Sequence, residues 1–123
     1  MIRGAVDARL EGIVRLRLRG RTGVELDIDV LVDSGCALSL TLPAATVAAL
    51  GLARRRGGTV ALADGSVVPT GIYDAEVEWD GVWRPVLVSE VGDEPLVGMK
   101  LMAGHRLQMD VVPGGAVEIT RLP

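Results

Sequence analysis

Asp33, Ser34 and Gly35 are the residues best suited to chemistry, within the stretch LVDSGCALSL that covers residues 31–40. Asp33 follows an apolar run, and a carboxylate at the end of a buried strand costs free energy unless it is hydrogen-bonded or shares a proton. Ser34 can donate through its hydroxyl, and Gly35 allows backbone N–H groups to approach closely. These residue types would support a catalytic carboxylate, but all three are also favoured in ordinary tight turns.

Cys36 and His105 offer a second possible chemistry, because a thiol nucleophile can be activated by a histidine base. They are the only cysteine and the only histidine of the chain. The residue types fit, but their spacing says nothing about proximity, and an inert buried cysteine with a surface or capping histidine is the competing interpretation. A single cysteine excludes an internal disulfide and argues against a metal site built from cysteines.

Two strands with alternating side chains lead into Asp33. Between residues 14 and 19 apolar residues alternate with arginines, and between 24 and 30 they alternate with acidic residues. This period of two predicts an antiparallel pair, and a register that pairs odd-numbered residues places arginines against carboxylates. Arg17 should then lie opposite Glu25 or Asp27, across a loop with an odd number of residues.

A helix is predicted shortly after the Asp33 segment. Pro43 suits its first position, the alanine-rich sequence up to Leu50 favours helix, and Gly51 suits a left-handed cap at its end. We interpret the basic run at residues 54–56 as a solvated loop that follows this helix.

The remainder of the chain predicts strands joined by turns. Asp-Gly dipeptides at residues 64–65 and 80–81 are typical of hairpin turns. A short apolar strand ends at Gly98, followed by one or two helical turns, another strand, a Pro-Gly-Gly turn and a last strand. The sequence therefore predicts one mostly β domain over residues 1–123, with one early and one late short helix.

Composition narrows the functional classes. The net charge of −3 provides no strong field for nucleic acid, and only three aromatic residues are available for base stacking. Charged residues near the start replace the apolar core of a signal peptide, and no stretch approaches the length of a membrane span. We expect a cytoplasmic protein without nucleic-acid or membrane partners, and with no metal or other cofactor.

Three motifs in order resemble the retropepsin-like aspartic proteases. VLVDSGCALSL is similar to their active-site segment, in which two apolar residues precede Asp-[Thr/Ser]-Gly, and PLVGM is similar to their later apolar-apolar-Gly motif. Between them, VALADGSVVPTGIYDAEVEW occupies the place of the flap hairpin that closes over substrate. The resemblance covers about residues 10 to 120. It implies an all-β retropepsin-like acid protease fold, a small β-barrel with one or two short helices and a flap hairpin.

The resemblance also implies a role for individual residues. Asp33 would be the catalytic aspartate, Ser34 would supply a buried hydroxyl that braces the two active-site loops across a dimer axis, and Gly35 would be a close-approach glycine. The flap tip would lie at or near Ala63, Asp64, Gly65 and Ser66. Serine replaces the commoner threonine after the aspartate, Cys36 stands where alanine or serine is usual, and an Asp-Gly pair stands where viral relatives have a glycine-rich flap tip.

Peptide hydrolysis by aspartates needs two carboxylates that share one proton, one to activate water and one to polarise the carbonyl. The chain has a single Asp-[Ser/Thr]-Gly, so the second Asp33 would come from another copy across a two-fold axis. The resemblance thus implies a homodimeric aspartic endopeptidase acting on peptide or protein substrates. We expect it to be inactive as a monomer and to favour acidic pH, because one carboxyl must keep its proton.

A non-catalytic module with the same fold is the alternative. It would bind a peptide or assemble other proteins. This interpretation applies if the flap cannot close or if the dimer does not form.

Overall fold

The charged hairpin that leads into Asp33 is formed by β2 (Gly12–Arg19) and β3 (Glu25–Val32) in the computed structural model, which describes residues 1–123. The two strands pair antiparallel, with Arg17 opposite Asp27 and an intervening loop of residues 20–24. Odd-numbered residues therefore face odd-numbered residues, and the predicted register is confirmed.

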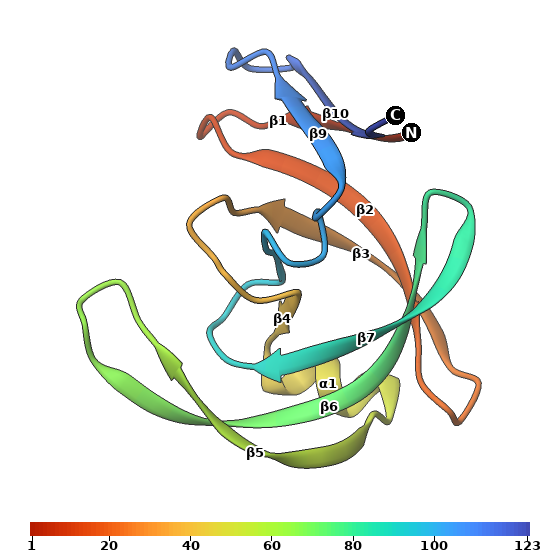
Figure 1. Ribbon diagram of the computed structural model, residues 1–123, viewed down its shortest axis with the longest axis vertical. Helices are drawn as coiled ribbons and strands as arrows, with labels where there is room; N and C mark the ends of the chain where they lie inside the picture. The colour runs from red at the N-terminus through yellow and green to blue at the C-terminus, as the bar shows by residue number, and fades with distance from the viewer.

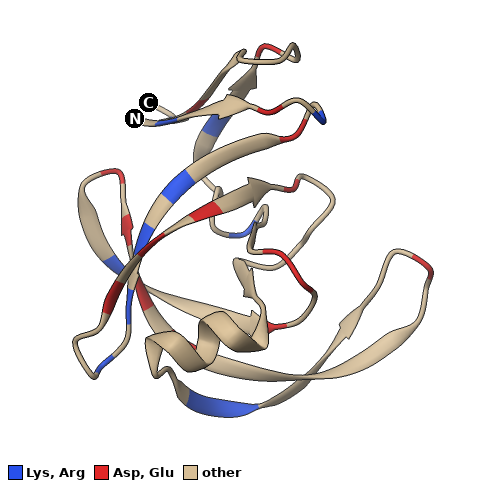
Figure 2. Cartoon of the chain, turned by 180° about the vertical axis from the view of Figure 1, so that it is seen from behind, with Lys and Arg blue, Asp and Glu red and all other residues tan.

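The outer face of this hairpin carries a ladder of ion pairs. The Arg15 Nε lies 3.0 Å from the Asp29 Oδ1, and the Arg17 Nε lies 2.8 Å from the Asp27 Oδ1. Figure 2 shows the resulting blue and red bands on the two neighbouring strands. The even-numbered apolar residues of β2 point the other way and are buried, as alternation along a strand requires.

The ladder continues from β2 onto a third strand, β6 (Val67–Trp79), which pairs antiparallel with the last residues of β2. There the Arg19 Nε lies 3.1 Å from the Glu76 Oε1, and the Arg19 guanidinium carbon lies 3.9 Å from the centre of the Trp83 ring. A cation over an aromatic face adds electrostatic attraction to this junction.

The contact between β2 and β6 closes six strands into a ring (Figure 1). Around the ring the order is β6, β7, β4, β8, β3, β2, and the remaining strands extend from it on either side. The elements not yet bounded are β1 (Ile2–Val6), β4 (Leu40–Leu42), β5 (Ala53–Ala61), β7 (Val82–Glu90), β8 (Leu96–Val97), β9 (His105–Met109) and β10 (Ala116–Arg121). The chain is thus mostly β, as predicted.

The core is one cluster of buried apolar side chains to which all six strands of the ring contribute. Leu18 of β2, Leu40 of β4 and Val88 of β7 are fully buried within it. The single helix α1 (Ala44–Leu50) adds Val47 and Leu50 from one face. This shared core holds the loops that follow β3 and β8 in a defined position.

The helix begins and ends close to the predicted residues. Pro43 precedes its first turn, and Gly51 adopts the left-handed conformation with φ 60° and ψ 39°, which confirms the predicted cap. No helix of the chain is both long and apolar enough to cross a membrane. The loop predicted at residues 54–56 is wrong, because these exposed arginines lie in β5, where the pairing with β6 shifts register between Arg54 and Arg56.

The predicted late helix is also wrong. Residues 99–104 form hydrogen-bonded turns, with the Met102 N–H donating to the Gly98 carbonyl and the His105 N–H donating to the Met102 carbonyl. Gly104 has a φ of +80°, and β9 begins at the next residue. The segment is held between Gly98, which pairs with the Ser39 carbonyl, and His105, which already pairs with Arg121 of β10.

The terminal strands were not anticipated as a pair. β1 pairs antiparallel with β10, and β10 pairs with β9. The two chain ends consequently lie side by side (Figure 1). β5 and β9 each have a neighbour on one side only, so they are the two open edges of the sheet.

Trp79 and His105 link the end of β6 to β9. The Trp79 Nε1 donates to the His105 Nε2 at 3.2 Å, and the His105 Nδ1 lies 3.0 Å from the Ala103 carbonyl oxygen. Trp79 is only 3 % exposed, so its N–H needs this acceptor.

We predict that acid destabilises the protein in part through Asp27. Hydrogen bonding from Arg17 lowers the pKa of the Asp27 carboxyl in the folded chain. A carboxyl with a lowered folded pKa stabilises the native state above its unfolded pKa of about 3.9. That contribution is lost as the pH falls through the folded pKa. Below about pH 5 the unfolding free energy of Asp27→Asn should therefore decline less steeply with falling pH than that of the wild-type protein. The difference in slope should correspond to the uptake of less than one proton on unfolding.

Urea denaturation of both proteins between neutral and strongly acidic pH measures this effect. Asp110→Asn serves as a control, because that exposed carboxylate accepts no hydrogen bond. Parallel pH profiles for the wild-type and Asp27→Asn proteins would contradict the assignment.

Candidate active site

Asp33 stands directly after the last residue of β3, and the strand beside it fixes its backbone. Val32 pairs with Val97 of β8, and the Asp33 N–H donates to the Val97 carbonyl at 3.0 Å. The side chain is partly buried. The apolar run before Asp33 is therefore a strand that is paired on both edges at Leu31, with Val30 fully buried and Val32 half-buried, and it delivers the carboxylate to the end of the sheet.

The Asp33 carboxylate is supported by the backbone of its own turn. The Gly35 N–H donates to the Asp33 Oδ1 at 2.9 Å, and the Cys36 N–H donates to the Asp33 carbonyl at 3.2 Å. Ser34, expected as a donor to this carboxylate, is exposed and makes no hydrogen bond to it within the chain. A Cβ atom at Gly35 would stand 3.2 Å from the Oδ1, so glycine leaves the carboxylate its space.

The loop after Asp33 is clamped by the segment that follows β8. The Gly98 N–H donates to the Ser39 carbonyl at 3.0 Å, and the Met99 N–H donates to the Cys36 carbonyl at 2.8 Å. The backbones cross so closely that a Cβ at Gly98 would lie 2.0 Å from the Leu38 carbonyl oxygen. This contact is the physical reason for the glycine in PLVGM.

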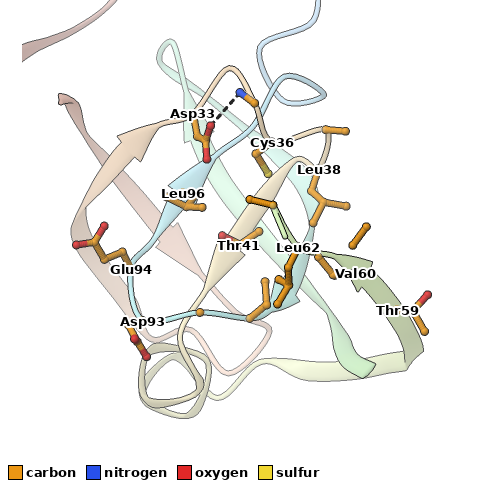
Figure 3. A pocket seen from close by; sticks show the side chains of 16 residues that line it. Asp33, Cys36, Leu38, Thr41, Thr59, Val60, Leu62, Asp93, Glu94 and Leu96 are labelled. Carbon is orange, nitrogen blue, oxygen red and sulfur yellow. Dashed lines mark hydrogen bonds between the residues drawn. The ribbon is translucent and has the colours of Figure 1, made fainter. Parts of the chain in front are cut away.

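A cleft of about 840 Å³ opens beside Asp33. Figure 3 shows Asp33 at one side, with Val60 and Leu62 of the β5–β6 hairpin on the other. Leu38 and Leu96 add further apolar surface. The cleft thus lies between the Asp33 loop and the hairpin that the resemblance identifies as a flap.

The structure brings only some of the predicted site residues to this cleft. Asp33, Gly35 and Ala63 line it, whereas Ser34, Asp64, Gly65 and Ser66 do not. The hairpin contributes the end of β5 and the first residues of the turn, residues 59–63.

Asp64 has a structural task at the hairpin tip. Its Oδ1 accepts hydrogen bonds from the Ser66 N–H at 2.8 Å and from the Ser66 hydroxyl at 2.6 Å. These bonds lower the pKa of the Asp64 carboxyl. The Leu62 N–H donates to the Ser66 carbonyl at 2.8 Å and closes the hairpin loop. The carboxylate is therefore engaged in stabilising the turn.

Several cleft residues lie outside the three motifs, among them Thr41, Asp93 and Glu94. Thr41 lies on β4, and Asp93 and Glu94 lie in the segment before β8. The position of Asp93 and Glu94 immediately before PLVG is the only sequence signal that could have indicated this acidic pair. The carboxylates of the chain do not gather with other ligand types into a group that could hold a metal ion.

The proposed pairing of Cys36 with His105 has no structural support. Cys36 lines the cleft, whereas His105 does not. The His105 Nε2 accepts from Trp79, and its Nδ1 contacts the Ala103 carbonyl oxygen. The structure therefore does not place His105 beside the thiol.

Comparisons of the chain with protein-family models, curated proteins and solved structures find no match. The function is consequently inferred from Asp33, its loop and the cleft.

We predict that Gly98→Ala destabilises the fold severely. The added methyl group would meet the Leu38 carbonyl, a backbone atom that cannot move aside without displacing the Asp33 loop. The unfolding free energy should fall by roughly 3 kcal/mol or more, the upper range for overpacking. Denaturant titration gives this value.

Gly57→Ala is the matched control, because a Cβ there would first meet the end of a flexible arginine side chain at 3.4 Å. Equal stability of the two alanine variants would show that the crossing at Gly98 is not a tight constraint.

Proposed function

We propose that the chain is a cytosolic aspartic endopeptidase of retropepsin type, which hydrolyses peptide bonds as a homodimer. The observation that carries this proposal is the setting of Asp33. Its partly buried carboxylate follows a strand that is paired on both edges, accepts a hydrogen bond from the Gly35 N–H and opens onto a cleft. A carboxylate held in this way is positioned for proton transfer.

The mechanism requires Asp33 from each of two chains. One carboxylate, in its ionised form, takes a proton from water, and the other, still protonated, polarises the scissile carbonyl. An extended substrate would lie between the Asp33 loop and the β5–β6 hairpin, with apolar side chains against Val60, Leu62 and Leu96. The closed ring of six strands and the long hairpin support the small barrel and flap that the resemblance implies.

One observation favours the alternative of a non-catalytic binding module. β1 and β10 pair with each other inside the chain, whereas the chain ends interleave between subunits in viral relatives. A dimer of this chain must therefore use other surfaces. Without such a dimer one carboxylate remains alone, and the cleft can bind a peptide but cannot cleave it by the shared-proton mechanism.

Asp33→Asn should abolish cleavage while leaving the fold intact. The amide keeps the shape and accepts the Gly35 hydrogen bond, but it cannot transfer the proton. We expect kcat/KM for a peptide substrate to fall by about 10²–10⁴-fold. Cleavage is measured by mass spectrometry on a peptide library, with circular dichroism as the check on folding.

Asp64→Asn is the matched control, because its side chain lies outside the cleft and the amide oxygen can still accept from Ser66. This variant should retain the chemical step. Cleavage by a folded Asp33→Asn protein at the wild-type rate would rule out the aspartic peptidase proposal.

Activity should depend on protein concentration. If two Asp33 carboxylates form one site, dilution below the dimer dissociation constant removes sites and the specific activity falls. Sedimentation velocity and cleavage rates across one dilution series test this. Full activity per chain in a strictly monomeric sample would exclude the shared site.

A further inference from the structure

The cleft beside Asp33 carries charge of one sign. Its charged lining residues are Asp33, Asp93 and Glu94, and no lysine or arginine lines it. None of the three takes part in an ion pair, although arginines elsewhere are paired with carboxylates along the β2–β3 ladder. An acidic lining without counter-charges attracts a cation.

Asp93 and Glu94, called here the rim carboxylates, lie at one end of the cleft. The strand register gives their place relative to Leu96 and Thr41. Leu96 pairs directly with Thr41 across the β4–β8 ladder. Glu94 and Asp93 are exposed residues of a bend and precede Leu96 by two and three residues, so their Cα atoms lie at most roughly 7 and 10 Å from that of Leu96. Figure 3 shows both carboxylates at the outer margin, with Leu96 and Thr41 between them and the centre of the cleft.

Thr41 provides an independent sign that this end receives a ligand. The residue is only 2 % exposed, lines the cleft, and has a hydroxyl without a hydrogen-bond partner. Figure 3 shows its oxygen on the side that faces Leu96 and Glu94. Buried hydroxyls are normally satisfied, so this one is available to a polar group of an occupant.

We propose that this end of the cleft is a subsite for a lysine or arginine residue of an extended peptide. The inference rests on the proposed function in one respect, that the cleft receives a peptide. The aliphatic stem of the basic residue packs on Leu96, its cationic head reaches Asp93 and Glu94, and its backbone N–H donates to the Thr41 hydroxyl. A long side chain with an apolar stem and a charged end matches this order of surfaces.

Binding is tested separately from cleavage with the Asp33→Asn chain, which leaves peptides intact. The probes are a series of fluorescently labelled peptides of alanine, valine, leucine and serine. Each peptide contains one lysine, and its position moves by one residue from peptide to peptide. Each has a matched peptide with norleucine or glutamine instead. We expect a lysine at one position to strengthen binding on the order of tenfold over either neutral partner, and added salt to reduce that advantage.

Two variants and a matched control test the subsite. Asp93→Asn combined with Glu94→Gln should remove the advantage of lysine, whereas Asp110→Asn combined with Glu118→Gln, outside the cleft, changes the net charge equally and should preserve it. Thr41→Val should weaken binding of all the peptides by roughly three- to tenfold. It should not lower thermal stability, because the hydroxyl it removes has no partner in the free chain.

The outcomes separate this inference from the proposed function. A lysine preference that survives the double substitution at Asp93 and Glu94, the absence of any preference, or the absence of peptide binding would each overturn the subsite. A preference that depends on the two carboxylates, in a wild-type protein that cleaves none of the peptides, would support the subsite and count against the peptidase.

Discussion

The structure depends on the way β2 divides one of its edges between two neighbours. Along one edge β2 pairs with β3, and along the other it pairs first with β1 and then, from Arg17 to Arg19, with β6. This change of partner separates the outer strands β1, β10 and β9 from the ring of six strands. Leu18, fully buried at the point of closure, makes the division favourable, because its burial requires both β3 and β6 to be in place. The position of Asp33 follows from this arrangement, since β2 holds one edge of β3 and β8 pairs with the other.

How much of the fold could be predicted depended on whether the deciding interactions were local. The β2–β3 register was predicted correctly because the alternation that decides it is local. Arg17 alternates with apolar residues in β2, and Asp27 alternates with apolar residues in β3, which is visible within a few residues. The arginines at residues 54–56 belong to a strand because β6 supplies a partner from a distant part of the chain, which no local pattern reveals. The turns after Gly98 are not helical because β9 must start at His105 to meet β10. Tertiary pairing overrode local propensity in both cases.

The candidate site was predictable to the same extent. Asp33 and Gly35 were identified because a carboxylate after an apolar strand needs a supporting donor, and the donor proved to be a backbone N–H instead of the Ser34 hydroxyl. The flap tip was located in sequence, but which hairpin residues face the cleft depends on the twist of β5 and β6. Leu62 and Ala63 therefore line it while Asp64 turns to Ser66. Thr41 and the rim carboxylates could not be assigned from the sequence, since only the parallel and antiparallel pairings around β4 and β8 bring them to one wall.

The placement of the three aromatic residues has a consequence for spectroscopy. Trp79 is buried against His105, Trp83 lies beneath the Arg19 guanidinium, and Tyr73 packs along Gly71, so all three belong to the β6–β7 hairpin. None of them lines the cleft. Intrinsic fluorescence and near-ultraviolet circular dichroism will accordingly follow the melting of this hairpin and its junction with β2 and β9. They have no chromophore at the cleft wall, so occupancy of the cleft has to be followed with a label on the ligand.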